Sequence, residues 1–265
     1  MNSAWQKFNR AEQHEQELRR HVEEYRSLDP VRFELSHNGA DTSARTVELT
    51  WTACIDHPIP DAFGLILGDL LTNLRATLDH ALYAHAMAHH RSNGSAGEGP
   101  KPNKMKYPIR HDEKQWVGDM QRDITPHISS AFFSAMKDQQ PFAARGAALR
   151  LDVLDNLVNI DKHRTINVVE YGMFDFSETK LSQTEGAVLS PVDLPLRDGE
   201  PVAVLRMPRP DGQSMRALPY DGLISFSESI DVLGTRMGLL GVSAALVATT
   251  KDALEELQRA AGTDW

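Results

Sequence analysis

The sequence has little cysteine, no long apolar segment and no excess of positive charge. Its 265 residues include one cysteine, so no intrachain disulfide can form. We expect Cys54 to be a small buried hydrophobe in a reducing compartment. The longest uncharged stretch, 237–250, is shorter than the ~20 residues that cross a bilayer. The N-terminal segment lacks the apolar core of a signal peptide, and we expect a cytoplasmic protein without membrane contact.

The charge balance limits the classes of partner. The chain has 28 Lys and Arg residues against 37 Asp and Glu residues, a formal net charge of −9. No broad basic face for bulk DNA binding is expected, and the balance favours a protein or small-molecule partner slightly over RNA. The remaining composition, 41% hydrophobic and 25% charged, is typical of a folded globular domain.

Several nucleotide-binding and catalytic motifs are missing. The sequence contains no Walker A loop, no GxGxxG segment after a strand, no GxSxG and no CxxC pair. Nucleotide-driven motors, Rossmann oxidoreductases and α/β-hydrolases are therefore disfavoured, and no cofactor is expected.

Helical and strand patterns occur in blocks, which predicts an α+β fold. We expect a single domain over 1–265, a helical bundle built on a long central helix (about 61–90) plus a small, mostly antiparallel sheet. The region 92–105, rich in Gly, Ser and Pro, is predicted to be a mobile loop. The other predicted helices are 3–27, 112–122, 126–138, 144–160 and 229–261, and the strands are 31–37, 45–56, 165–176, 201–209 and 223–227.

The predicted central helix has a leucine face and an unusual polar face. On the side opposite the leucines, Asp69, Asn73 and His80 fall within about 40° of one another. Arg75 and Asp79 flank this row at i,i+4 spacing, and no Lys or Glu occurs between 63 and 91. We expect protein to enclose this face, so that the row forms a site. The alternative is a hydrogen-bonded structural network with an Arg75–Asp79 surface pair.

The same helix carries several histidines near its C-terminus. His85 and His89 have the i,i+4 spacing that lets two imidazoles face one ion. No HExxH glutamate accompanies them and no third ligand is evident, so no metal is expected. A metal-dependent hydrolase that uses this histidine cluster stays open as an alternative.

A second polar cluster lies at the C-terminal end of the helix predicted over 144–160. Its residues are Asp161, Lys162, His163 and Arg164, immediately before a predicted strand. Cations at a helix C-terminus compensate its exposed carbonyls. Alternatively, these four residues and Asp69 bind a ligand in a cleft shared with His80. Two histidines could then serve as general base and acid on a phosphodiester.

Four short segments resemble a family of bacterial and phage proteins that has no assigned activity. They are Gly68-Asp69 with the run NLRATLDH over 73–80, YPI over 107–109, QPF over 140–142 and DKHR over 161–164. The resemblance covers roughly residues 60–170 and implies no reaction.

Arg75 followed by His80 is also similar to the catalytic signature of HEPN-domain ribonucleases. This similarity implies a metal-independent endoribonuclease of the toxin or phage-defence type that works as a homodimer. His80 would be the general acid and base, Arg75 would stabilise phosphate charge, and Asn73 and Asp79 would orient them. The competing hypothesis is a non-catalytic binding or regulatory protein of phage or bacterial origin that acts through protein contacts.

Overall fold

The computed structural model describes residues 3–38, 45–93, 99–143, 151–163, 169–176, 185–191, 195–209 and 224–262, and it describes only the backbone of 119, 121, 122, 162, 163, 173–176, 191, 224 and 225. Its helices are α1 (Ser3–Arg26), α2 (Ala62–Ser92), α3 (Glu113–Asp119), α4 (Ser130–Asp138), α5 (Leu151–His163) and α6 (Leu239–Ala261). Shorter turns are Pro102–Lys104, Met120–Ile124 and Thr125–His127. The strands are β1 (Val31–His37), β2 (Thr46–Ile55), β3 (Glu170–Phe176), β4 (Val188–Pro191), β5 (Pro201–Pro208), β6 (Ile224–Val232) and β7 (Thr235–Gly238).

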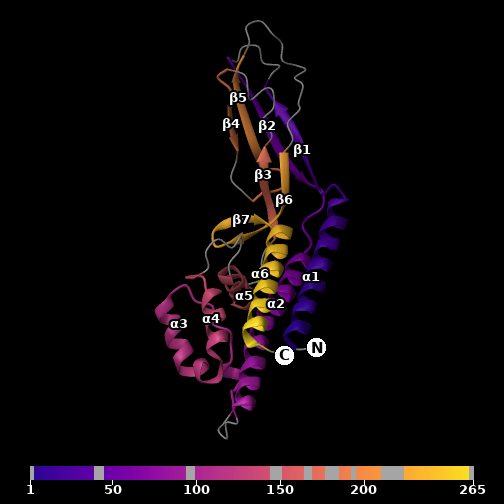
Figure 1. The fold of residues 1–265 in the computed structure, drawn as a ribbon. Helices are drawn as coiled ribbons and strands as arrows, with labels where there is room; N and C mark the ends of the chain where they lie inside the picture. The colour runs from indigo at the N-terminus through magenta and orange to yellow at the C-terminus, as the bar shows by residue number, and fades with distance from the viewer. Residues whose placement is uncertain are drawn as a thin grey trace.

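The helical part is built on α2, as the leucine periodicity predicts. The helix is continuous over Ala62–Ser92 and packs against α1, α5 and α6. Its leucine face is fully buried at Leu67, Leu70, Leu71, Leu74 and Leu78. Figure 1 shows α1, α2 and α6 running alongside one another, with α3 and α4 at the side of this bundle. The predicted central helix is confirmed.

Two antiparallel sheets lie beyond one end of the bundle (Figure 1). One has the strand order β1-β2-β5-β4 and the other β3-β6-β7. In β2, burial alternates along the strand, with Val47, Leu49, Trp51 and Ala53 on the core face. The α+β class is confirmed. The predicted hairpin of the first two strands is confirmed too, since β1 and β2 pair from Val31 with Ile55 to His37 with Leu49.

Cys54 does not have the burial expected of it. It lies on β2 directly after buried Ala53, and successive strand residues point to opposite faces. Its side chain is therefore only half-buried. The expectation of a buried hydrophobe was wrong because the strand alternation places Cys54 on the outer face.

The predicted helix over 229–261 begins ten residues later than expected. Residues 229–238 complete β6 and form β7, joined by a tight turn in which Leu233 and Gly234 have φ angles of 52° and 82°. The Gly234 amide donates to Asp231 Oδ1 at 2.9 Å. Backbone with positive φ cannot continue a right-handed helix, so α6 starts only at Leu239. Strand β4 was not expected at all.

The remaining predicted segments are confirmed in part. The segment 112–122 contains α3 followed by a π turn, and 126–138 contains α4. Of 144–160, residues 144–150 lie outside the described residues and α5 covers the rest. Of the predicted loop 92–105, residues 94–98 lie outside them and Pro102–Lys104 forms a 3-10 turn. Among the described helices, none is long and apolar enough to span a membrane.

Candidate ligand-binding cleft

Tyr107 is the residue on which one wall of the candidate site is built. Its amide donates to Asp79 Oδ1 at 2.7 Å, and its carbonyl accepts from Arg75 Nη2 at 2.6 Å. Both backbone groups of this fully buried residue are therefore held by side chains of α2. Buried backbone groups need such partners, so the pair fixes the segment after the 3-10 turn against the helix.

Gln139 and Gln140, at the end of α4, hold the same segment from the other side. The Tyr107 hydroxyl donates to Gln139 Oε1 at 2.7 Å, and the Arg110 amide donates to Gln140 Oε1 at 3.0 Å. Gln140 is fully buried. Three of the four segments that carried the family resemblance thus meet around Tyr107, which gives these residues a structural role.

The Arg75 guanidinium is turned inward. Besides the bond to Tyr107, its Nη1 lies 3.5 Å from Asp155 Oδ1 on α5, and its Nη2 lies 3.7 Å from Asp79 Oδ1. Nη1 is shielded from solvent and makes no hydrogen bond among the described groups. Arg75 therefore joins α2, α5 and the Tyr107 segment through its terminal nitrogens.

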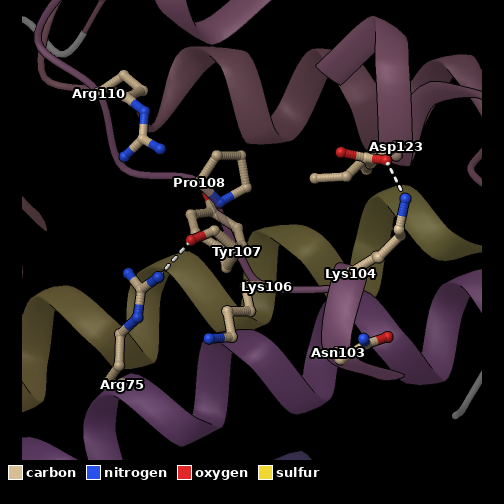
Figure 2. A pocket seen from close by; sticks show the side chains of 9 residues that line it. Arg75, Asn103, Lys104, Lys106, Tyr107, Pro108, Arg110 and Asp123 are labelled. Atoms are coloured by element: carbon tan, nitrogen blue, oxygen red, sulfur yellow. Dashed lines mark hydrogen bonds and ion pairs between the residues drawn. The ribbon is translucent and has the colours of Figure 1, made fainter. Parts of the chain in front are cut away.

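A half-open cleft of about 300 Å³ lies beside this wall, and we call it the basic cleft. Four cations line it, namely Arg75, Lys104, Lys106 and Arg110. The other lining residues are Asn103, Tyr107, Pro108, Asp123 and Ile124. Figure 2 shows Arg75, Lys106 and Arg110 toward one end of the cleft and the Lys104–Asp123 pair toward the other.

Carboxylates near the cleft pair with two of the four lining cations. Asp123 Oδ1 accepts from Lys104 Nζ at 3.1 Å, and Arg75 lies near Asp79 and Asp155. Among the described side chains, no carboxylate lies within 4 Å of the exposed Lys106 amine. The Lys106 amine therefore contributes a positive charge that no described carboxylate offsets, on a chain whose net charge is −9. Ammonium and guanidinium groups in a cleft bind carboxylate or phosphate oxygens through charge-assisted hydrogen bonds.

The polar row predicted on α2 lies away from this cleft. Asp69 is exposed, and Asn73 and His80 are half-buried. The Asn73 amide donates to the Asp69 carbonyl at 2.8 Å within the helix. None of the three lines the basic cleft, and on a continuous helix His80 lies about 140° around from Arg75.

The second predicted cluster contacts α2 through Asp161, and Asp155 on the same helix contacts α2 as well. Asp155 lies near Arg75, and Asp161 lies against Gly68, where an added Cβ would come within 2.8 Å of Asp161 Oδ1. The backbone of Lys162 and His163 completes α5, and their side chains, like all of Arg164, lie outside the described residues. Asp155 and Asp161 contact α2 at Arg75 and Gly68, so α2 and α5 run antiparallel along this contact.

His85 has a packing role. Its ring stacks on Phe132 with centroids 4.0 Å apart, and its Nε2 accepts from the Ser129 amide at 3.2 Å. Burial, with a smaller effect from His89, lowers the pKa of His85 to about 4. Within the part of the chain whose side chains are described, no group of three or more His, Cys, Asp or Glu residues could hold a metal ion.

Sequence reasoning missed most of the cleft. Lys104, Lys106, Arg110 and Asp123 were not among the candidates, because the first two lie in or beside a segment read as a loop. One signal was present: exposed Lys104 and Lys106 alternate with buried Met105 and Tyr107. Such alternation indicates an ordered segment with one face on the core.

Comparisons with protein-family models, with curated proteins and with solved structures found no match to this chain.

Proposed function

We propose that this protein is a binding protein for a small anionic ligand, which it holds in the basic cleft. This proposal rests on the cations that line the cleft, because one of them, Lys106, has no carboxylate beside it among the described residues. The surrounding bonds to Tyr107 and Arg110 fix the wall before any ligand arrives, and a preformed site loses less conformational entropy on binding. The residual charge is sufficient for one anionic group and too small for the many phosphates of a polynucleotide.

Titration with inorganic phosphate, followed by NMR chemical shifts, tests this proposal. We expect saturable binding with a dissociation constant in the millimolar range, and about tenfold weaker binding by Lys106→Gln, which removes one charge-assisted contact. Lys251→Gln is the matched control, because Lys251 is exposed on α6 away from the cleft. Absence of saturable binding, or equal loss in both variants, would contradict the proposal.

A metal-independent endoribonuclease is the second candidate function, and the position of Arg75 in the cleft favours it. Arg75 would stabilise charge on a bound phosphate, His80 would transfer protons, and Asn73 and Asp79 would orient them. Because His80 lies on another side of α2, a second copy of the chain would have to bring a histidine to that phosphate. This candidate therefore includes a homodimer, and the resemblance to toxin and phage-defence ribonucleases implies a bacterial or phage origin.

RNA cleavage in EDTA tests this second candidate. Cleavage by the wild type that disappears in a folded His80→Ala variant would support it, together with a dimeric mass in light scattering. A wild-type protein that leaves RNA intact would exclude it and would leave the binding proposal unaffected.

A further inference from the structure

Strand β1 forms an open edge of the four-stranded sheet (Figure 1). Among the described strands, only β2 pairs with it, and the two pair without a register shift. Its seven residues include no proline, whereas β4 at the opposite edge has four residues and ends in Pro191. Short length and proline are two features that protect a sheet edge against pairing with another chain. The β1 edge has neither of them.

The backbone groups of alternate β1 residues point away from β2. Just beyond the strand, the Asn38 amide donates to the Glu48 carbonyl, so the even-numbered positions form the hydrogen-bonded pairs with β2. The N–H and C=O groups of Val31, Phe33 and Leu35 therefore face the open edge. None of these groups bonds to another group of the described chain. The edge thus offers an added strand three donors and three acceptors.

The same three residues carry apolar side chains on the inner face of the sheet. Val31 is buried, whereas Phe33 and Leu35 are only half-buried and pack against the core. The Phe33 ring contacts Phe226 of β6 edge to face, with centroids 5.7 Å apart. An added strand with apolar side chains on this face would cover the part of Phe33 and Leu35 that remains exposed.

The outer face of β1 carries one charge of each sign. Arg32 and Glu34 are exposed and pair with each other, and Arg32 Nε also lies 3.0 Å from Asp56 Oδ2. Exposed pairs of this kind contribute little to stability and exchange partners at little cost. A charged edge normally disfavours pairing, but here the two charges are opposite and are two residues apart on one face.

A second copy of β1 matches this edge in one register. In an antiparallel pair centred on Phe33, Val31 lies opposite Leu35 of the other copy, and the open backbone groups of both strands bond to each other. Arg32 of each copy then lies opposite Glu34 of the other. A pair centred on Arg32 or on Glu34 would instead place like charges opposite each other, which is destabilising.

We propose that the protein forms a homodimer in which two β1 strands pair antiparallel about Phe33. The two four-stranded sheets then become one continuous sheet. Only one strand of each copy makes the contact, and small interfaces associate weakly, so we expect a dissociation constant on the order of 10–100 μM. This inference is independent of both candidate functions, because it requires neither an anion in the basic cleft nor RNA cleavage.

Sedimentation equilibrium over a range of concentrations tests this inference. The mass of the wild type should rise with concentration from 29.5 kDa toward twice that value. Arg32→Glu alone and Glu34→Arg alone should each weaken association about tenfold or more, because each places like charges opposite each other at two points. An equimolar mixture of the two variants should associate again, since every charge then faces its opposite. The double variant should also associate.

Arg206→Glu is the matched control for these charge changes. It breaks an exposed pair with Glu48 at 2.7 Å, between β5 and β2 in the interior of the same sheet, and should leave association unchanged. A monomeric wild type, which would leave the edge to an extended segment of another protein, would overturn the inference. So would a dimer that Arg32→Glu and Glu34→Arg leave intact, or variants that stay monomeric when mixed.

Amide hydrogen exchange provides a readout of the backbone pairing itself. The amides of Val31, Phe33 and Leu35 should exchange several-fold more slowly at high protein concentration, because they become hydrogen-bonded only in the dimer. The amides of Arg32 and Glu34 already face β2 and should change less. Exchange that does not alternate along β1, or that does not depend on concentration, would contradict the proposed pairing.

Discussion

At the scale of single residues, several of the side chains singled out for their chemistry also hold the fold. Arg75 directs its terminal nitrogens to the Tyr107 carbonyl and to Asp155, and Asp79 accepts from the Tyr107 amide. His85 accepts from the Ser129 amide at the start of α4. Lys106, a residue that no motif marked, is left exposed in the cleft. The sequence shows which reactions or contacts a side chain is able to make. The neighbours that hydrogen-bond to its polar atoms decide whether those atoms are available to a ligand.

The buried imidazole of His85 makes stability depend on pH. Its pKa in the folded state is lowered to about 4, while an unfolded histidine has a pKa of about 6.5. Between these values the unfolded chain takes up a proton that the folded chain does not. The stabilisation is therefore fully present above pH 6.5 and is lost as the pH falls toward 4. We expect the free energy of unfolding to fall by roughly 2 kcal/mol from this residue alone.

Urea unfolding of the wild type and of His85→Gln at pH 7, 5.5 and 4.5 measures this contribution. Glutamine offers an oxygen to the Ser129 amide and does not titrate. The variant should lose less stability than the wild type between pH 7 and 4.5. Parallel pH curves for the two proteins would show that His85 is not the group responsible.

At the scale of elements, the contact between α2 and α5 depends on a glycine. An added Cβ on Gly68 would lie 2.8 Å from Asp161 Oδ1, which is closer than real Cβ atoms approach, and 3.2 Å from its Cγ. The small residue lets the two helices approach at the point where Asp161 meets α2. Two of the segments that carried the family resemblance are thereby explained by packing.

Replacing glycine by alanine at two helical positions tests this contact. Alanine favours the helix by about 0.5–1 kcal/mol where space allows, and Gly241 in α6 has nothing within 4 Å of an added Cβ. We expect Gly241→Ala to raise the free energy of unfolding by up to that amount. Gly68→Ala should lower it by about 1 kcal/mol, because Asp161 must move. A gain of similar size in both variants, measured by urea unfolding, would show that the Asp161 side chain moves aside without a cost in stability.

Periodicity predicted some elements and failed for others, for identifiable reasons. The leucines of α2 and the alternation in β2 repeat over many residues, so both elements were predicted close to their observed bounds. Strand β4 has four residues, too few for a period to show. The apolar residues in 229–238 are compatible with a strand or a helix, and the turn at Leu233 and Gly234 favours the strands.

At the scale of the whole molecule, an aromatic cluster joins the helices to the sheets. Tyr25 of α1 packs edge to face on Phe63 and stacks on Tyr171 of β3, which in turn contacts Phe226 of β6. The Tyr25 and Tyr171 hydroxyls hydrogen-bond to each other, and Tyr25 also donates to the His57 carbonyl at 2.6 Å. Phe226 continues the contact to Phe33 of β1. The helical part and the two sheets are thus joined by a packed boundary.

An ion pair between a buried carboxylate and a half-exposed arginine at this boundary makes a testable contribution to stability. Glu228 of β6 is 1% exposed and accepts from Arg26, the last residue of α1, through Nη2 at 2.6 Å and Nε at 3.0 Å. Arg26→Met leaves the buried carboxylate without its cation and should lower the free energy of unfolding by about 2 kcal/mol, less than for a fully buried pair because the Arg26 side chain is 46% exposed. Adding Glu228→Gln to that variant should recover part of the loss, because the uncompensated charge is removed.

The control for this pair is Arg20→Met, which breaks an exposed α1 pair with Glu24 at 2.8 Å. Exposed pairs contribute little, so the expected loss is below about 1 kcal/mol. All variants are compared by urea unfolding followed with circular dichroism at one pH. Equal losses for Arg20→Met and Arg26→Met would show that the burial of Glu228 does not strengthen its pair with Arg26.

The sequence by itself determined the α+β class, the long leucine-faced helix and the strand alternation. These features depend on side-chain periods of 3.6 and 2 residues, which are visible in the order of neighbouring residues. It also marked the residues around Tyr107, without saying that they meet. Only the tertiary structure decided which polar atoms bond within the protein and which remain available to a ligand. The basic cleft unites α2, the segment after Lys101 and the turn at Met120–Ile124, which are distant along the chain. Their convergence follows from core packing between helices, and no local pattern encodes it.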